Sequence, residues 1–143
     1  MNAQRHFAFA VIFALTGCTF GAPSASNTAN AGARTIDVNL TSFMQGYSPD
    51  VLTVAVGTRV QFTNTDSFAH TATAVSGTTF PAASPFDGAA LVASGSLLSA
   101  PWSSGNLIAG ASSQVFIADR AGTYLFGCFY HYGHPMQGEI VVQ

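Results

Sequence analysis

Three side chains near the C-terminal end of the chain have the chemical types and the spacing of metal ligands that share one loop. Cys128 is followed by two residues and then His131, and His131 by four residues and then Met136. A thiolate, an imidazole and a thioether form a soft donor set, which suits copper. The spacing therefore predicts a metal site in the loop between a strand that ends at Cys128 and a strand that begins near Gly138.

One more imidazole is needed to complete such a site, and His70 supplies it. It is the only histidine after residue 34 that lies outside the C-terminal loop, and it follows the turn-forming residues 64–67 at the start of a predicted strand. A trigonal arrangement of two histidines and one cysteine with a weak axial methionine is typical of blue-copper sites. We therefore predict one copper ion per chain, held by His70, Cys128, His131 and Met136.

Three other interpretations of these residues stay open. His134, three residues after His131, is a competing ligand. One cysteine and two histidines can also be completed as a tetrahedral zinc site. A buried cysteine can equally serve as a small hydrophobic side chain, in which case Cys128 and Met136 are core residues of a structural domain that binds no metal.

The N-terminus has the pattern of an export signal. Arg5 precedes a short apolar run at 7–15, so we predict a signal peptide over residues 1–17 and an exported protein. The sequence Leu-Thr-Gly-Cys at 15–18 resembles the lipobox of bacterial lipoproteins, in which cleavage before the cysteine leaves Cys18 as a lipid-bearing N-terminus. The alternative is an ordinary cleavage site after Ala22 or Ala25, which would discard Cys18.

Residues 18–33 are predicted to form a flexible tether to a folded domain at 34–143, because their small and polar side chains cannot bury enough surface to offset the entropy of ordering. With Cys18 lipidated, this arrangement predicts a periplasmic or cell-surface protein that is attached to the membrane only through its lipid. Cys128 then has no partner for a disulfide, which is unusual in an exported domain and is explained by metal binding.

The composition indicates an all-β fold. The chain is 48% hydrophobic and only 7% charged, yet no apolar run reaches the roughly 18 residues of a membrane-spanning helix. Segments rich in Val, Thr and Phe alternate with turns, which favours strands. We predict strands at 35–40, 51–56, 59–64, 70–75, 114–118, 123–128 and 139–142. The Gly-, Ser- and Pro-rich stretch 77–105 is expected to contain a short strand or helical turn that covers the edge of the core.

Two segments of the domain together resemble the plastocyanin-like cupredoxins. The first comprises SPDVLTV at 48–54, Gly57, VQFTNTD at 60–66, and His70 followed by Thr71. The second comprises AGTYLFGC at 121–128, then His131, then MQGEIVV at 136–142. Ligand order, ligand spacing and flanking strands agree in both segments, and the resemblance covers about residues 34–143.

The resemblance implies a Greek-key β-sandwich of about seven to eight strands with copper near one end. It favours Met136 over His134 as the axial ligand, because a glycine and an apolar strand follow Met136 as they follow the family's axial methionine. Thr71 would help to hold the loop that carries Cys128.

The resemblance also implies an apolar surface around His131 on which partners dock, which Tyr130, Tyr132 and Pro135 could form. Ordinary packing of each tyrosine around the loop is the alternative. The implied function is electron transfer by copper cycling between Cu(I) and Cu(II), with a cytochrome or a copper enzyme as the redox partner. A periplasmic or extracellular copper carrier that uses the same ligands is the alternative.

Other classes of function fit the sequence poorly. Copper oxidases and nitrite reductases need further histidines for a catalytic copper, and only three histidines follow the leader, so an enzyme is not expected. Three arginines against six carboxylates give the mature domain a formal charge of −3 without a basic cluster, which excludes nucleic acid as a partner. We expect a monomer that meets its partner through a small, transient contact.

Overall fold

Eight strands account for the alternating segments of the sequence in the computed structural model, which describes residues 35–143. They are β1 (Thr35–Ser42), β2 (Gly46–Ser48), β3 (Val51–Val54), β4 (Arg59–Asn64), β5 (Thr73–Val75), β6 (Phe116–Ile117), β7 (Gly122–Gly127) and β8 (Gln137–Val142). One 3-10 helix, η1 (Gly88–Leu91), lies between β5 and β6. Among the described residues, no helix has the length and apolar character needed to cross a membrane. The predicted signal peptide, the tether and Cys18 lie outside the described residues.

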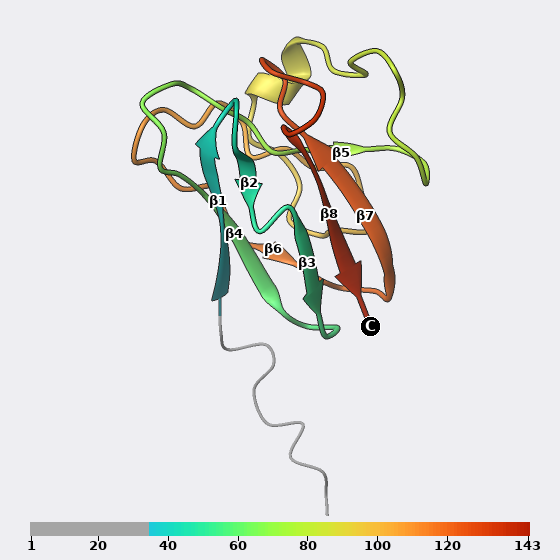
Figure 1. Ribbon diagram of the computed structural model, residues 1–143. Coiled ribbons are helices and arrows are strands. Elements are labelled where there is room, and N and C mark those ends of the chain that lie inside the picture. Colours follow the sequence, from blue (N-terminus) through green and yellow to red (C-terminus); the bar gives the residue numbers. More distant parts are fainter. Residues whose placement is uncertain (1–34) are drawn as a thin grey trace, which may run out of the picture.

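The strands form two four-stranded sheets that face each other (Figure 1). One sheet has the order β2-β1-β4-β6 and the other the order β3-β8-β7-β5. Neighbours β1 and β4 run parallel, as do β3 and β8, whereas the remaining neighbours are antiparallel. The prediction of an all-β Greek-key sandwich with seven to eight strands is confirmed.

Aromatic rings fill the space between the sheets. Along β4, burial alternates, so that Val60, Phe62 and then Asn64 point inward. Phe62 lies at the centre, with its ring centroid 5.1 Å from that of Phe126 and 5.5 Å from that of Trp102. The last inward position of β4 is therefore occupied by a buried amide, at the end of the sandwich where β7 ends.

The structure differs from the predicted strands in the region around His70. A strand was expected over residues 70–75, but β5 begins only at Thr73. Residues 70–72 pair instead with an irregular segment: His70 forms a bridge with Leu107, and the amide of Ser104 donates to the carbonyl of Ala72. The expected helical turn in the stretch 77–105 is η1. Strand β2 was not predicted, because three residues are too few to show alternation.

Candidate metal centre

Cys128 is placed by the pairing of the last strands. β7 and β8 pair antiparallel from Gly122 with Val142 to Gly127 with Gln137, and Cys128 follows directly. The amide of Cys128 then donates to the carbonyl of Met136 at 3.2 Å, which closes the loop between the two strands. The thiol is free and fully buried. In Figure 1 this loop lies at the end of the sandwich opposite the C-terminus.

His70 is placed by the loop that follows β4. Its backbone amide donates to the carbonyl of Leu107 at 3.1 Å, and the amide of Leu107 donates back to the carbonyl of His70 at 2.9 Å. The side chain of His70 has no exposed surface. This two-way pairing holds His70 across from the loop that carries Cys128.

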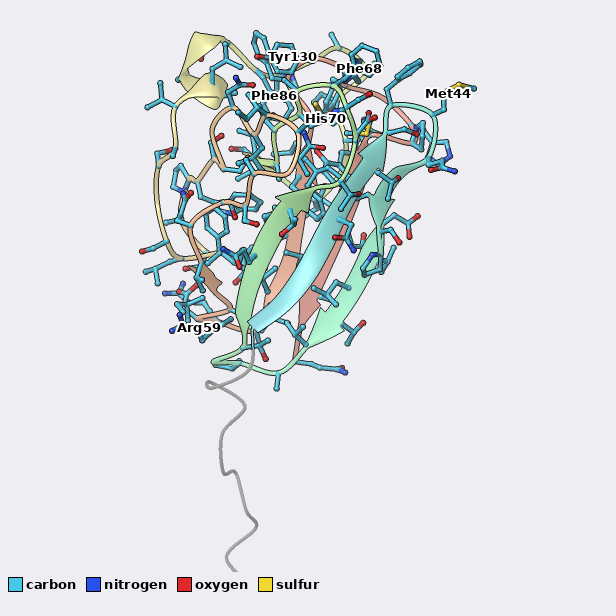
Figure 2. All side chains as sticks on the ribbon, turned by 90° about the vertical axis from the view of Figure 1, so that its left-hand side faces the viewer. Met44, Arg59, Phe68, His70, Phe86 and Tyr130 are labelled. Carbon is cyan, nitrogen blue, oxygen red and sulfur yellow. The ribbon has the colours of Figure 1, made fainter. Side chains whose placement is uncertain are left out.

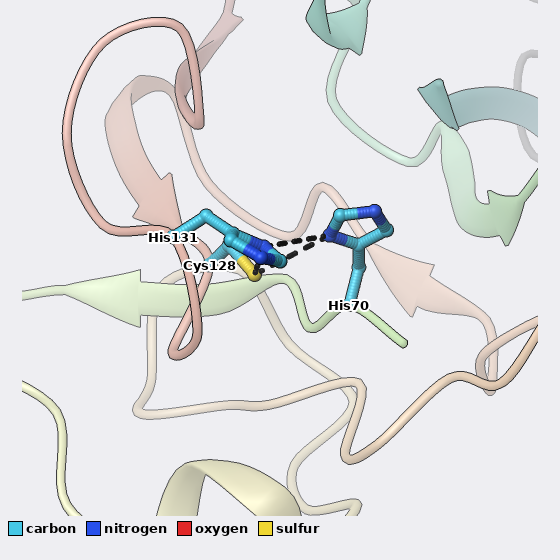
Figure 3. Close-up of side chains that lie close together, drawn as sticks. All are labelled: His70, Cys128 and His131. Carbon is cyan, nitrogen blue, oxygen red and sulfur yellow. Dashed lines mark hydrogen bonds between the residues drawn. The ribbon is translucent and has the colours of Figure 1, made fainter. Parts of the chain in front are cut away.

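Three donor atoms converge at this end of the sandwich (Figure 3). The Sγ atom of Cys128 lies 3.7 Å from Nδ1 of His70 and 3.8 Å from Nδ1 of His131. The two Nδ1 atoms lie 3.2 Å apart. Three of the four residues predicted from the sequence to bind metal are thus brought together with their donor atoms facing one another.

The triangle of donor atoms has the dimensions of a metal site. The point equidistant from its three corners lies about 2.1 Å from each, close to the bonds of about 2.0–2.1 Å to nitrogen and about 2.3 Å to sulfur that zinc, an ion of similar size, forms in proteins. One thiolate and two imidazoles are also the trigonal donor set that blue-copper proteins use. The residues present therefore fit a copper ion.

Met136 and His134 occupy different environments in the same loop. Met136 is fully buried, and its carbonyl accepts from the amide of Cys128. His134 is exposed, lines a surface pocket with Met44 and Asp50, and is not among the residues whose donor atoms converge. Burial next to Cys128 favours Met136 over His134 as a fourth ligand.

Thr71 connects the two halves of the site. Its hydroxyl accepts from the amide of Phe129 at 2.9 Å, and its own amide points to Sγ of Cys128 at 3.5 Å. The loop-holding role that the resemblance implied for Thr71 is thus borne out. A weak N–H contact to sulfur stabilises negative charge on the thiolate.

Tyr47 was not predicted to belong to this site. The phenol of Tyr47, in β2, is buried and donates to the carbonyl of Thr71 at 2.7 Å. Burial raises the pKa of Tyr47 well above its usual range, and negative charge on the neighbouring Cys128 adds to the effect. Tyr47 therefore stays a neutral donor that ties the first sheet to the segment carrying His70.

His131 lies partly in solvent and packs against an aromatic ring. The ring of Phe43, in the turn between β1 and β2, stacks on that of His131 with centroids 5.5 Å apart and planes inclined by 26°. In the metal-free protein the pKa of His131 is lowered, first because burial disfavours the charged ring and second because of repulsion from His70. The neutral form that binds metal is thereby favoured.

A patch of apolar side chains surrounds this end of the molecule. We call it the apical patch, and it consists of Phe43, Met44, Phe68 and Tyr130, which are between 43% and 75% exposed. Figure 2 shows Met44, Phe68 and Tyr130 at the same end as His70. Phe43 and Tyr130 are the members that flank the ring of His131.

The predicted docking surface of Tyr130, Tyr132 and Pro135 needs correction. Tyr130 is 43% exposed as expected. Tyr132 is instead turned toward the stretch 77–105, where its ring packs on Phe86 and its hydroxyl donates to the carbonyl of Pro81. Pro135 is half-buried and lies against Gly46, so closely that a side chain at Gly46 would collide with its carbonyl. Phe43, Met44 and Phe68 were missed because exposed apolar residues in turns show no periodicity.

A carboxylate contacts the other nitrogen of His70. Nε2 of His70 lies 2.8 Å from Oδ2 of Asp66, four residues earlier in the same loop. This hydrogen bond is the main reason why the pKa of Asp66 lies below its usual value. The sequence marked Asp66 only as a turn residue, although its position four residues before His70 was a possible signal.

Comparison with known proteins agrees with this geometry. Residues 34–143 match the family described as copper binding proteins, plastocyanin/azurin family. No curated protein matches the sequence of the chain.

Solved structures with the same fold include a cupredoxin, an auracyanin and a nitrite reductase. A purple cupredoxin from Nitrosopumilus maritimus is 21% identical, with a TM-score of 0.52 over 75% of this chain and 98% of that one. Dithionite-reduced auracyanin from the photosynthetic bacterium Roseiflexus castenholzii is 24% identical, with a TM-score of 0.52 over 76% and 96%. A copper-containing nitrite reductase from Thermus scotoductus is 21% identical, with a TM-score of 0.52 over 77% of this chain but only 22% of that one.

Sequence identity of 21–24% shows only that these proteins share a fold. The family match, in contrast, covers most of the chain, and the converging donor atoms are an independent chemical argument for a metal site. The two observations together identify a cupredoxin with a site for one copper ion. The chain belongs to the copper-binding plastocyanin/azurin family.

Proposed function

We propose that this protein transfers electrons through a type 1 copper site in which His70, Cys128 and His131 form the trigonal plane and Met136 is the weak axial ligand. Bound copper supplies a one-electron couple between Cu(I) and Cu(II). The observation that carries the proposal is the triangle of donor atoms, which already has metal-binding dimensions and is buried on the side of His70 and Cys128.

Rigid positioning of the ligands supports electron transfer. Backbone hydrogen bonds from Cys128 to Met136 and between His70 and Leu107 fix the two loops, and Thr71 connects them. Ligands held in this way move little when the charge on the metal changes, so the cost of reorganisation is small. A carrier that must release its metal needs a more open set of ligands, and full burial of two of the three donor residues disfavours that alternative.

The apical patch provides a docking surface for the redox partner. Two of its side chains, Phe43 and Tyr130, flank His131, the one proposed ligand of the trigonal plane with exposed surface, so a partner seated there would approach the metal through this ring. A small apolar contact without strong charge allows fast dissociation, which a shuttle needs. We infer that the partner is a redox protein with an apolar face, such as a cytochrome or a copper enzyme, and that the protein acts as a monomeric carrier and not as an enzyme.

The first experiment is a visible absorption spectrum of the copper-loaded domain, residues 34–143, before and after reduction with ascorbate. We expect an intense thiolate-to-copper band that disappears on reduction and is absent from Cys128→Ser. Retention of the band during dialysis against a chelator separates an electron carrier from a copper carrier. A folded protein without the band would contradict the proposal and favour a zinc site or a structural domain.

Substitutions in the C-terminal loop test the axial ligand. Met136→Leu should change the band and raise the reduction potential, because loss of the thioether removes a donor that stabilises Cu(II). His134→Ala is the matched control in the same loop and should leave both unchanged, since His134 is exposed. If His134→Ala altered the spectrum and Met136→Leu did not, the axial assignment would be reversed.

We further propose that the protein is exported and held at the membrane surface by a lipid on Cys18, with residues 18–33 as the tether. The sequence at 15–18 and the unpaired Cys128 support this arrangement. Mass spectrometry of the membrane fraction should detect a diacylglyceryl group on Cys18, and Cys18→Ala should release the protein from that fraction. Cleavage after Ala22 or Ala25 would contradict it.

A further inference from the structure

The two nitrogens of His70 have separate partners. Nδ1 is the atom that faces Cys128 and His131. Nε2 lies 2.8 Å from Oδ2 of Asp66. The side chain of His70 has no exposed surface and that of Asp66 is only 12% exposed, so this contact is largely shielded from water. A charged hydrogen bond in such surroundings is stronger than one at an exposed surface.

The loop holds the carboxylate of Asp66 in place without help from the metal. Asn64, the last residue of β4, is fully buried, and its Oδ1 accepts from the amide of Asp66 at 2.9 Å. Its Nδ2 donates to the carbonyls of Phe68 at 2.7 Å and Leu107 at 2.8 Å. The other carboxylate oxygen of Asp66 accepts from the amide of Ser67 at 2.7 Å. Both carboxylate oxygens of Asp66 therefore have hydrogen-bond partners, one in the backbone of the loop and the other in the imidazole ring of His70.

We propose that Asp66 is a positioning residue that fixes His70 in the tautomer with its proton on Nε2, and that its negative charge lowers the reduction potential of the bound copper. This inference rests on the proposed role of His70 as a ligand. With the proton held on Nε2 by the carboxylate, the lone pair of Nδ1 is directed to the metal. A carboxylate behind the ring also makes the imidazole a stronger donor, which favours Cu(II) over Cu(I) because the ion with the larger charge gains more.

The test compares Asp66→Asn with Asp119→Asn. Both substitutions remove one negative charge and leave an oxygen acceptor. Asp119 is half-buried, accepts hydrogen bonds from Ser99, and precedes the start of β7, at the opposite end of that strand from Cys128. We expect the reduction potential to rise in Asp66→Asn and to stay at the wild-type value in Asp119→Asn. An equal shift in both variants, or in neither, would overturn the inference.

Two measurements do not depend on copper redox chemistry. Nitrogen-15 NMR of the metal-free wild-type protein in mildly alkaline solution should show His70 protonated on Nε2 alone, whereas Asp66→Asn should show a mixture of tautomers. The affinity for Zn²⁺, which has no redox chemistry, should fall about tenfold or more in Asp66→Asn, the usual cost of losing such a partner. An Nδ1-protonated ring in the wild-type protein would refute the inference even if the variant failed to fold.

These results separate failure of this inference from failure of the proposed function. An intense visible band in wild type and in Asp66→Asn, with identical potentials, would leave the electron-transfer site standing and remove the role of Asp66. Absence of the band from the wild type would contradict the proposed function, while the tautomer and the Zn²⁺ affinity would still report whether Asp66 positions His70.

Discussion

The two imidazoles of this site are chemically identical but lie in opposite surroundings. His70 is fully buried, and a carboxylate contacts its second nitrogen. His131 is partly exposed, and Phe43 stacks on its face. One ring is held by hydrogen bonds within the protein and the other by an aromatic contact at the surface. The comparison separates two tasks of an electron carrier, which are to hold the metal and to meet a partner.

The difference arises from the elements that carry the two rings. His70 follows β4, whose last inward residue is the buried Asn64, so that the loop is tied to the core. His131 lies in the loop between β7 and β8, which ends the sandwich and borders solvent. A ligand at a loop tip can be reached by another protein, whereas a ligand beneath the loops cannot.

The largest effect should come from removing each ring in turn. His70→Gly and His131→Gly should both lose the visible band, but added imidazole should restore it only in His131→Gly, because only that cavity opens to solvent. Titration of each copper-loaded variant with imidazole measures the difference. Restoration of the band in His70→Gly would show that the two sides are equally accessible and would remove the basis of the comparison.

A smaller effect is expected from Asn64→Ala on the side of His70. The substitution removes three hydrogen bonds and leaves the amide of Asp66 and the carbonyl of Phe68 without the partner that Asn64 supplies, so the free energy of unfolding should fall by roughly 2–4 kcal/mol. Emission of Trp102, the single tryptophan of the chain and a buried residue, reports unfolding in urea. A loss below about 0.5 kcal/mol would show that the loop does not depend on this amide.

On the side of His131, Phe43→Ala should change stability by less than about 1.5 kcal/mol, since the ring is 47% exposed. It should slow electron self-exchange between copies of the protein by up to about tenfold, because the apical patch loses an apolar contact next to His131. Val56→Ala, at a residue that is also 47% exposed but in the turn before β4, is the control and should not affect exchange. Equal rates in the two variants would argue against docking at the apical patch.

The smallest effect on stability is expected at Asp119, which lies away from both histidine rings. Hydrogen bonds from Ser99 lower the pKa of Asp119 below its ordinary value, so the stability that this group contributes is present above the ordinary pKa and is lost as the pH falls through the lower pKa of the folded protein. Asp119→Asn should therefore weaken the acid dependence of unfolding in this window. An unchanged acid profile would show that the shift has no consequence for stability.

Local patterns predicted most of the fold and part of the site. Alternation located β4 and β8, which bury every second residue, and a short apolar run located β7, each within one or two residues. Alternation failed for the segment after His70, whose hydrogen bonds go to residues 103–107, 30 or more positions away. The tyrosines near His131 show the same limit, since the packing of Tyr132 on Phe86 depends on where the stretch 77–105 returns.

By itself the sequence predicted the ligand types, their order and the family, because Cys128, His131 and Met136 share one short loop and His70 is the only histidine of residues 34–143 outside that loop. Only the tertiary structure decided which groups contact the ligands. Asp66 lies behind His70 in the same loop, whereas Tyr47 beneath Thr71 and Phe43 against His131 come from the β1–β2 region, which is distant from both partners in the sequence. The physical reason is that ligand spacing within a loop is fixed by the covalent chain, whereas burial and contacts between loops depend on how the two sheets pack.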